Sequence, residues 1–182
     1  MAATVQQIRA ALEQYTDPYL RQSLQQAGAL RELELNGRTV VAVVELGIPV
    51  GGYEAQFRSE LAAHLAAAGL QGLELQLELR SGIVPHGVQR PLKPIPGVGN
   101  IIAVASGKGG VGKSTVAVNL ALAWAAAAAR VGLLDADIYG PSQPLMLGLS
   151  GQRPTAPDGK HVEPLVAHGI KSMSIGFLVD AA

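Results

Sequence analysis

The sequence predicts two domains of different class: a small α+β domain over residues 1–80 and an α/β domain with a parallel sheet over residues 100–182. Residues 81–99 between them contain four prolines and four glycines, a density that prevents both helix propagation and strand pairing. Upstream of this linker, apolar and acidic residues alternate before an Asn-Gly pair, a pattern typical of a β-hairpin. Downstream, a glycine-rich loop separates a short apolar run from a segment of strong helix formers, which favours a strand-helix-strand unit.

Three helices are expected in the first domain. Helical spacing of apolar residues from Val5 to Tyr15 predicts an amphipathic helix behind a Thr4 cap. Asp17-Pro18 supplies an N-cap residue followed by proline at the first helical position, so a second helix is expected from there to Gly28. The third helix is marked by helical spacing from Phe57 onward and is expected to end near Gly69.

The strands of the first domain are expected around a hairpin. Leu30–Leu35 alternates apolar and acidic residues, Asn36-Gly37 predicts a type I′ turn, and Arg38–Leu46 is rich in β-branched residues. After the third helix, Leu73–Leu79 alternates again and predicts the last strand. The resulting order of helix, helix, strand, strand, helix, strand is that of a two-layer α+β domain.

The second domain is expected to begin with a strand at Asn100–Ala105, followed by a helix over Ser114–Ala129. A second strand over Arg130–Leu134 ends at Asp135, and a weaker strand pair is expected at His161–Glu163 and Gly169–Ser174. Parallel sheets normally contain several strands covered on both faces, so we expect the sheet in this chain to be incomplete.

Composition excludes several classes of protein. The chain has 14 basic and 14 acidic residues and is 48% hydrophobic, which argues against disorder and against a global electrostatic field for polyanions. The basic group of Arg21, Arg31 and Arg38 lies among acidic residues, so we expect a mixed surface and no nucleic-acid partner.

The absence of cysteine excludes disulfides, cysteine nucleophiles and thiolate-bound metal centres from anything that this chain does alone. No secretory signal pattern is visible between Met1 and Glu13, and the longest apolar stretch, Leu120–Ala129, is about half of a membrane span. We therefore expect a cytoplasmic protein with no membrane partner.

The glycine-rich loop carries the strongest chemical signal. Its residues Gly107-Lys108-Gly109-Gly110-Val111-Gly112-Lys113-Ser114 match the P-loop pattern G-x-x-x-x-G-K-S/T between a predicted strand and a predicted helix. Glycines let the backbone curve around a phosphate with its N–H groups pointing inward, and the helix N-terminus adds its dipole. Lys113 would reach the β- and γ-phosphates, Ser114 would ligate Mg²⁺, and Thr115 could donate to the α-phosphate. The second domain is thus predicted to be an α/β P-loop NTPase domain.

The same glycines allow another interpretation, a dinucleotide-binding turn. Gly107, Gly109 and Gly112 also spell G-x-G-x-x-G, and Asp135 follows about 20 residues later, as that fold requires. Lys113-Ser114 directly after the last glycine is what a phosphate–Mg²⁺ site needs and a dinucleotide turn does not, so we favour the P-loop.

Asp135 and Asp137 follow the second predicted strand, at the edge where open α/β sheets place their ligands. Paired carboxylates there can hold the Mg²⁺ shell through water and orient an attacking water. We expect Asp135 to contact Mg²⁺ through water. The alternative is a structural role in which each aspartate caps the following loop.

Lys108 is unusual because an ordinary P-loop needs no lysine there; it is either a solvated surface residue or a group that neutralises phosphate charge from a partner subunit. The run from Gly107 to Thr115 resembles the deviant Walker A motif of the family that includes nitrogenase iron protein, MinD and ParA. This resemblance implies a nucleotide-sandwich homodimer that Lys108 reaches across, and a water-positioning role for Asp137 in switch I. Lys108, Lys113 and Asp137 are then the candidate catalytic residues.

Further segments resemble the Mrp/ApbC subfamily of ATP-dependent iron-sulfur cluster carriers. They are Asp137-Ile138-Tyr139-Gly140-Pro141-Ser142, Asp17-Pro18 before the hairpin, Leu46-Gly47-Ile48-Pro49, and the linker from Leu92 to Val98. The resemblance implies a small domain of the iron-sulfur assembly type, ATP and Mg²⁺ as ligands, and a 4Fe-4S cluster as cargo. It also implies apo iron-sulfur proteins and cluster scaffold proteins as partners.

Members of this subfamily are longer than this chain and continue through a Walker B-like strand and a Cys-x-x-Cys pair that ligates the cluster. We therefore expect this chain to be an N-terminal portion of a longer protein, without the cluster-ligating region. Two other hypotheses stay open. One is a positioning or partition ATPase of the MinD or ParA kind, and the other is a non-catalytic binding fragment whose small domain recruits partner proteins.

Overall fold

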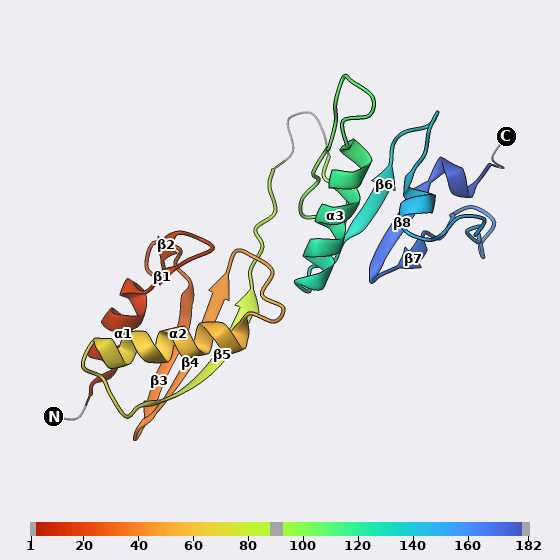
Figure 1. Ribbon diagram of the computed structural model, residues 1–182. Helices are drawn as coiled ribbons and strands as arrows, with labels where there is room; N and C mark the ends of the chain where they lie inside the picture. Colours follow the sequence, from red (N-terminus) through yellow and green to blue (C-terminus); the bar gives the residue numbers. More distant parts are fainter. Residues whose placement is uncertain (1–2, 88–92, 180–182) are drawn as a thin grey trace. The chain divides into compact units, whose positions relative to one another are not determined.

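The computed structural model describes residues 3–87 and 93–179 (Figure 1). The chain divides into two compact units, Met1–Asn100 and Ile101–Ala182. Pro91 and Leu92, both assigned above to the linker, lie outside the described residues. The described linker residues 82–87 and 93–99 contain neither helix nor strand.

The first unit is a three-stranded sheet with its two helices on one core (Figure 1). Its strands are in the order β3 (Leu30–Asn36), β4 (Thr39–Leu46) and β5 (Glu74–Ser81), with β3 and β4 antiparallel and β4 and β5 parallel. Along the central strand β4, which the sequence predicts as a β-branched run, alternate side chains are fully buried, as the period of a strand requires. These buried side chains are Val40, Ala42, Val44 and Leu46.

The two helices of this unit form at the positions that the sequence predicts. α1 (Val5–Gln14) begins behind Thr4, which forms a capping box with Gln7, and it buries Ile8 and Leu12 completely. α2 (Glu54–Ala67) buries Phe57, Leu61 and Leu65 on one face. A stripe of this spacing packs one side of a helix against the core, and the remaining surface of α2 carries polar residues and alanines.

The predicted second helix is wrong. Asp17 does cap a turn, since its Oδ1 accepts the N–H groups of Tyr19 (2.9 Å) and Leu20 (2.8 Å). The turn is not propagated, because Arg21 has a left-handed φ of 53° and the chain then reverses. The carboxylate is fully buried, and its Oδ2 accepts a hydrogen bond from the Tyr53 hydroxyl (2.9 Å). The segment forms two short paired strands instead, β1 (Thr16–Asp17) and β2 (Gln22–Ser23).

The hairpin forms as predicted, but its turn is not of type I′. Asn36 pairs with Thr39, so the loop consists of Gly37 and Arg38. Gly37 has a φ of 66°, while Arg38 is not in the left-handed region that a type I′ turn requires at both positions. Glycine alone at the first loop position is the pattern of a type II′ turn. Arg38 is held in this loop by its Nε, which donates to the Gly72 carbonyl oxygen (2.8 Å).

The second unit packs α3 (Lys113–Ala126) on a sheet of order β6-β8-β7 (Figure 1). β6 (Gly132–Asp135) and β8 (Ile170–Ser174) are parallel, and β7 (Leu165–Ala167) is antiparallel to β8. The short helix α4 (Gln143–Met146) follows β6, and the 3₁₀ turn η1 (Ile175–Phe177) follows β8. No helix within the described ranges is both long and apolar enough to cross a lipid bilayer.

Two strand predictions in this unit are wrong. Residues 100–105 form no strand and are exposed, Ile101 to 66%, and none of the described strands pairs with them. An unpaired extended segment gains no ladder hydrogen bonds, so the apolar run alone does not produce a strand. The strand expected at His161–Glu163 is also absent. There Asp158 Oδ1 accepts the N–H groups of Lys160 (2.9 Å) and His161 (2.7 Å), which fixes a turn, and the strand begins two residues after Glu163 as β7.

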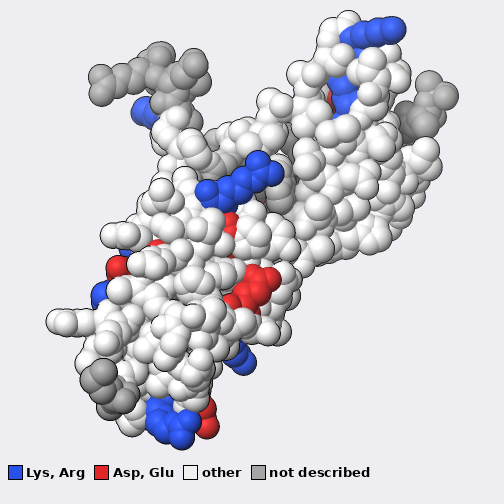
Figure 2. Space-filling model, turned by 60° about the vertical axis from the view of Figure 1, so that its left-hand side comes forward, with Lys and Arg blue, Asp and Glu red and all other residues white. Residues whose placement is uncertain are grey.

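Charged side chains of both signs share the surface. Figure 2 shows Lys and Arg side chains in separate places rather than in one continuous basic field over the face in view. On the first unit, Arg31 pairs with Glu45 (3.2 Å) and Arg80 with Glu78 (2.6 Å). The Arg31–Glu45 pair agrees with the mixed surface that the sequence predicts around Arg31.

Candidate functional site

The glycine-rich loop lies directly before α3, and two of its glycines have left-handed backbone conformations. Gly110 has a φ of 74° and Gly112, the N-cap of α3, a φ of 90°. Any other residue would be strained at these two positions. Gly107 and Gly109 have no such constraint, and a Cβ at either would meet no atom of the described chain within 4 Å. The chain's own packing therefore does not explain these two glycines, whereas close approach of a bound group would.

The N-terminus of α3 is open to an anion. No side chain caps the helix, since Gly112 has none to offer, and the Gly112 carbonyl oxygen accepts the N–H of Val116 (2.9 Å). The preceding N–H groups of the first turn belong to Lys113, Ser114 and Thr115 and have no intrahelical partner by geometry. A helix N-terminus carries about half a positive charge, so this end attracts phosphate or carboxylate groups.

The two lysines of the loop differ in their surroundings. Lys108 is exposed, and its N–H is held by Ser106 Oγ (3.1 Å), which fixes the start of the loop. Lys113 is half-buried at the first position of α3. Lys113 is thus part of the helix that would receive the phosphate, whereas Lys108 lies in the loop before it and is exposed.

Asp135, at the end of β6, is a structural anchor for the loop that follows. Its Oδ1 accepts the N–H of Asp137 (3.1 Å), and its Oδ2 accepts the N–H groups of Ser142 and Gln143 (both 3.1 Å) and the hydroxyl of Ser174 (3.2 Å). The capping role that the sequence left open is therefore present. Oδ1, with one donor, still has a lone pair for a water.

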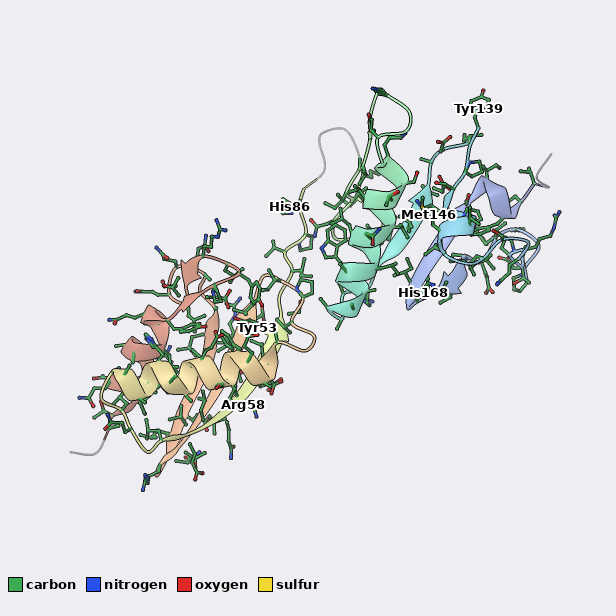
Figure 3. All side chains as sticks on the ribbon, in the orientation of Figure 1. Tyr53, Arg58, His86, Tyr139, Met146 and His168 are labelled. Carbon is green, nitrogen blue, oxygen red and sulfur yellow. The ribbon has the colours of Figure 1, made fainter. Side chains whose placement is uncertain are left out.

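Asp137 is the more available carboxylate. It is exposed, and its Oδ1 accepts the N–H of Gly140 (3.0 Å), a bond within its own loop. Tyr139 stands at the tip of the same loop, points away from the ribbon (Figure 3) and is fully exposed. The loop thus presents one carboxylate and one aromatic ring to solvent.

The structure joins the two parts of the site through a residue that sequence analysis missed. Gln143 Nε2 donates to the carbonyl oxygen of Ser114 in the first turn of α3 (3.2 Å), while the Gln143 N–H binds Asp135. Gln143 and Ser174 were not singled out from the sequence. A polar residue between Ser142 and Pro144, at the start of an otherwise apolar helix, was the available signal for Gln143.

The oxygen donors of this region fit a shared Mg²⁺ better than a metal held by protein alone. Within the described residues, no group of three or more His, Cys, Asp or Glu side chains could hold a metal ion. The Ser114 hydroxyl and the Asp135 carboxylate are hard oxygen donors, and Mg²⁺ is commonly bound by one or two such groups together with phosphate oxygens and water. The site therefore fits Mg²⁺ that arrives with a nucleotide.

Comparisons with known proteins match both units. Residues 97–182 match the family described as NUBPL iron-transfer P-loop NTPase, and residues 5–71 match the family described as iron-sulfur cluster assembly protein. The iron-sulfur cluster carrier protein of Haemophilus influenzae is 42% identical over 177 residues, which are 96% of this chain and 47% of that protein.

Two further relatives with the same description agree. That of Escherichia coli strain K12 is 43% identical over 175 residues, 94% of this chain and 46% of its own length. That of Synechocystis is 42% identical over 182 residues, 97% of this chain and 51% of its own length. The chain thus spans about half the length of the curated relatives it matches.

Proposed function

We propose, from the match of residues 97–182 to the NUBPL iron-transfer P-loop NTPase family, that this chain supplies the nucleotide-binding part of an ATP-dependent iron-sulfur cluster carrier. The observation that carries the proposal is the open N-terminus of α3 behind Gly110 and Gly112, hydrogen-bonded through Gln143 to the Asp135 loop. This arrangement brings N–H groups that can donate to a phosphate, and oxygens that can bind a metal ion, into one region.

The loop residues have complementary roles in nucleotide binding. The backbone from Gly107 to Gly112, with Val111 among the glycines, surrounds the β-phosphate, and the first-turn N–H groups of α3 point toward it. Lys113 neutralises the β- and γ-phosphates, and Thr115 donates to the α-phosphate. Bound Mg²⁺ would supply charge neutralisation between the phosphates, held by the Ser114 hydroxyl and, through water, by Asp135.

Hydrolysis is assigned to Asp137 and Lys108. Asp137 keeps a carboxylate oxygen that is not used by the Gly140 bond, and it orients the attacking water. Lys108, which is exposed, neutralises phosphate charge across a homodimer, as the resemblance to the deviant Walker A family implies. Lys108→Ala should therefore leave ATP binding within about threefold of wild type and lower hydrolysis at least about a hundredfold.

The 4Fe-4S cluster is the cargo, and other residues must ligate it. This chain contains no cysteine and so supplies no thiolate ligand. The match of residues 5–71 to an iron-sulfur assembly family supports a role of the first unit in recruiting apo iron-sulfur proteins or cluster scaffold proteins. Transfer of the cluster then belongs to the whole protein, with ATP turnover in the second unit.

The comparisons favour this proposal over a MinD- or ParA-like positioning ATPase. The carrier relatives match nearly the whole chain, the first unit included. Salt-sensitive DNA binding that requires ATP would favour the positioning alternative instead.

Reconstitution tests the proposal as a whole. A protein of the length seen in the relatives would be incubated without oxygen with iron and sulfide, then mixed with an apo protein that accepts a 4Fe-4S cluster. We expect iron uptake and activation of the acceptor. Failure to take up iron while ATP binding is intact would contradict the carrier function and leave the nucleotide site standing.

A further inference from the structure

Gln143 is a buried polar residue that contacts both halves of the nucleotide region. Its side chain is 3% exposed, and its Nε2 donates to the Ser114 carbonyl oxygen at 3.2 Å. Its own N–H donates to Asp135 Oδ2 at 3.1 Å. One residue therefore links the turn that carries the Ser114 hydroxyl with the carboxylate at the end of β6.

The segment around Gln143 is held firmly in place. A Cβ at Gly176 in η1 would lie 3.0 Å from Pro144 Cγ and 3.2 Å from Pro141 Cγ, so glycine permits the close packing of this segment on η1. Ser174, the last residue of β8, donates through its hydroxyl to Asp135 Oδ2, the oxygen that also accepts the Gln143 N–H. A displacement of α4 would therefore disturb several contacts together.

The carboxamide oxygen of Gln143 has no role in the described contacts. Gln143 Oε1 is buried and has no hydrogen-bond partner among the described residues, and the neighbouring Ser142 Oγ is in the same condition. Buried polar atoms in folded proteins are nearly always paired with protein or with ordered water. Two adjacent unpaired oxygens beside Asp135 and Ser114 point to water or ligand groups at this position.

We propose that Gln143 is a positioning residue for the Mg²⁺–nucleotide site. Its Nε2 fixes the first turn of α3 against the Asp135 loop, and its Oε1 accepts a hydrogen bond from a water that lies between Ser114 and Asp135. The proposal rests on the nucleotide function proposed above. It differs from a packing role, since a packing residue would support the fold equally with and without Mg²⁺.

Substitution of Gln143 by methionine tests this role, because methionine has a similar length and shape but neither donates nor accepts at this position. The matched control is Gln152→Met, the same change at an exposed glutamine. ATP affinity of the protein is measured by titration calorimetry with Mg²⁺ and again with EDTA. We expect Gln143→Met to weaken ATP binding about fivefold to tenfold with Mg²⁺ and less than about twofold in EDTA. Gln152→Met should behave as wild type in both.

An equal loss of affinity with and without Mg²⁺, or no loss at all, would overturn the proposal. If Gln143→Met does not fold, Gln143→Asn takes its place, because the shorter carboxamide cannot reach the Ser114 oxygen. The same Mg²⁺-selective loss of ATP affinity is expected for this variant. An unselective loss, or no loss, overturns the proposal equally. Wild-type protein that binds no ATP in either condition would overturn the nucleotide function and this inference together. Normal wild-type binding with an unselective variant would overturn this inference alone.

Discussion

The two units of the chain differ in how completely they bury their apolar residues. In the first unit, both helices pack on one face of the sheet, and Ile8, Phe57 and Leu61 are fully buried. In the second unit, Ile170 is fully buried, but Ile101 is 66% and Leu134 72% exposed. The described core of the first unit is thus larger than that of the second, although Tyr19 (63%) and Val84 (70%) of the first unit are exposed as well.

The larger described core lies in the unit that does not carry the candidate nucleotide site. Loops that bind ligands usually belong to the less stable part of a structure, since they must open and close. The candidate residues Lys113, Ser114 and Asp135 all lie in the less completely buried unit. We expect the first unit to unfold as a separate, more stable body, and the following changes test that expectation.

The largest effect is expected from Phe57→Ala in the core of the first unit. Phe57 is fully buried and contacts the rings of Tyr15 and Tyr53, with centroids 5.6 Å and 5.4 Å away. Its truncation should lower the free energy of unfolding of this unit by about 3 to 5 kcal/mol. The single tryptophan, Trp124, lies in α3 and reports on the second unit, while tyrosine absorbance reports mainly on the first.

Denaturant titration with both probes separates the two units. Phe57→Ala should move the tyrosine transition to lower denaturant and leave the Trp124 transition in place. The matched variant Ile170→Ala, at a fully buried position of the second unit, should do the reverse. Coincident shifts of both probes in either variant would show that the units unfold together.

Alkaline pH should destabilise the first unit selectively. Burial, followed by the hydrogen bond to Glu60, raises the pKa of Tyr15 above its usual range, and burial with the hydrogen bond to Asp17 does the same for the pKa of Tyr53. A phenol whose pKa is higher in the folded state stabilises the fold fully below the unfolded pKa of about 10, and this contribution is lost as pH rises beyond it. The tyrosine transition should therefore weaken between about pH 10 and 12, while the transition of the second unit, whose Tyr139 is fully exposed, should change less.

Tyr53→Phe sharpens the same comparison at neutral pH. The change removes the hydroxyl that donates to buried Asp17 Oδ2 at 2.9 Å, so one lone pair of a buried carboxylate loses its partner. We expect a loss of about 1 to 3 kcal/mol in the unfolding free energy of the first unit. The variant should also reduce the alkaline sensitivity. Unchanged stability would mean that water replaces the hydroxyl.

Thr4→Ala should have the smallest effect. Thr4 Oγ1 accepts the N–H of Gln7 at 3.3 Å, and the Gln7 side chain returns the bond to the Thr4 N–H at 3.0 Å. Loss of such a cap costs about 1 kcal/mol. Chemical denaturation followed by circular dichroism measures this loss of stability. The control is Thr155→Ala, in a loop of the second unit. The exposed Thr115 is not used as a control, because it belongs to the candidate site.

Local sequence signals predicted the elements whose cause is local. The helix cap at Thr4, the β-branched run of β4 and the glycine loop before α3 all depend on residues close in sequence. The prediction failed at Asp17, where the cap is present but Tyr53 of a distant segment draws the carboxylate into the core. Nothing near Asp17 in the sequence contains that information.

The site was predictable in its residue types but not in its connections. The roles of Lys108, Lys113 and Asp137 remain predictions. Asp135 accepts four hydrogen bonds, one of them from Ser174. This set of contacts depends on the pairing of β6 with β8. The strand predicted at 100–105 fails for the same reason, since an apolar run needs a neighbouring strand that the local sequence does not specify.

Equilibrium binding of ATP to Lys113→Ala tests the central claim most directly. Fluorescence or calorimetric titration with Mg²⁺ should show binding to wild type and at least about a tenfold weaker binding to the variant, because a charge-assisted contact to phosphate is lost. Lys160→Ala, the same change at an exposed lysine outside the site, should bind as wild type does. Equal ATP affinity of Lys113→Ala and wild type would contradict the assignment of the glycine-rich loop as the nucleotide site.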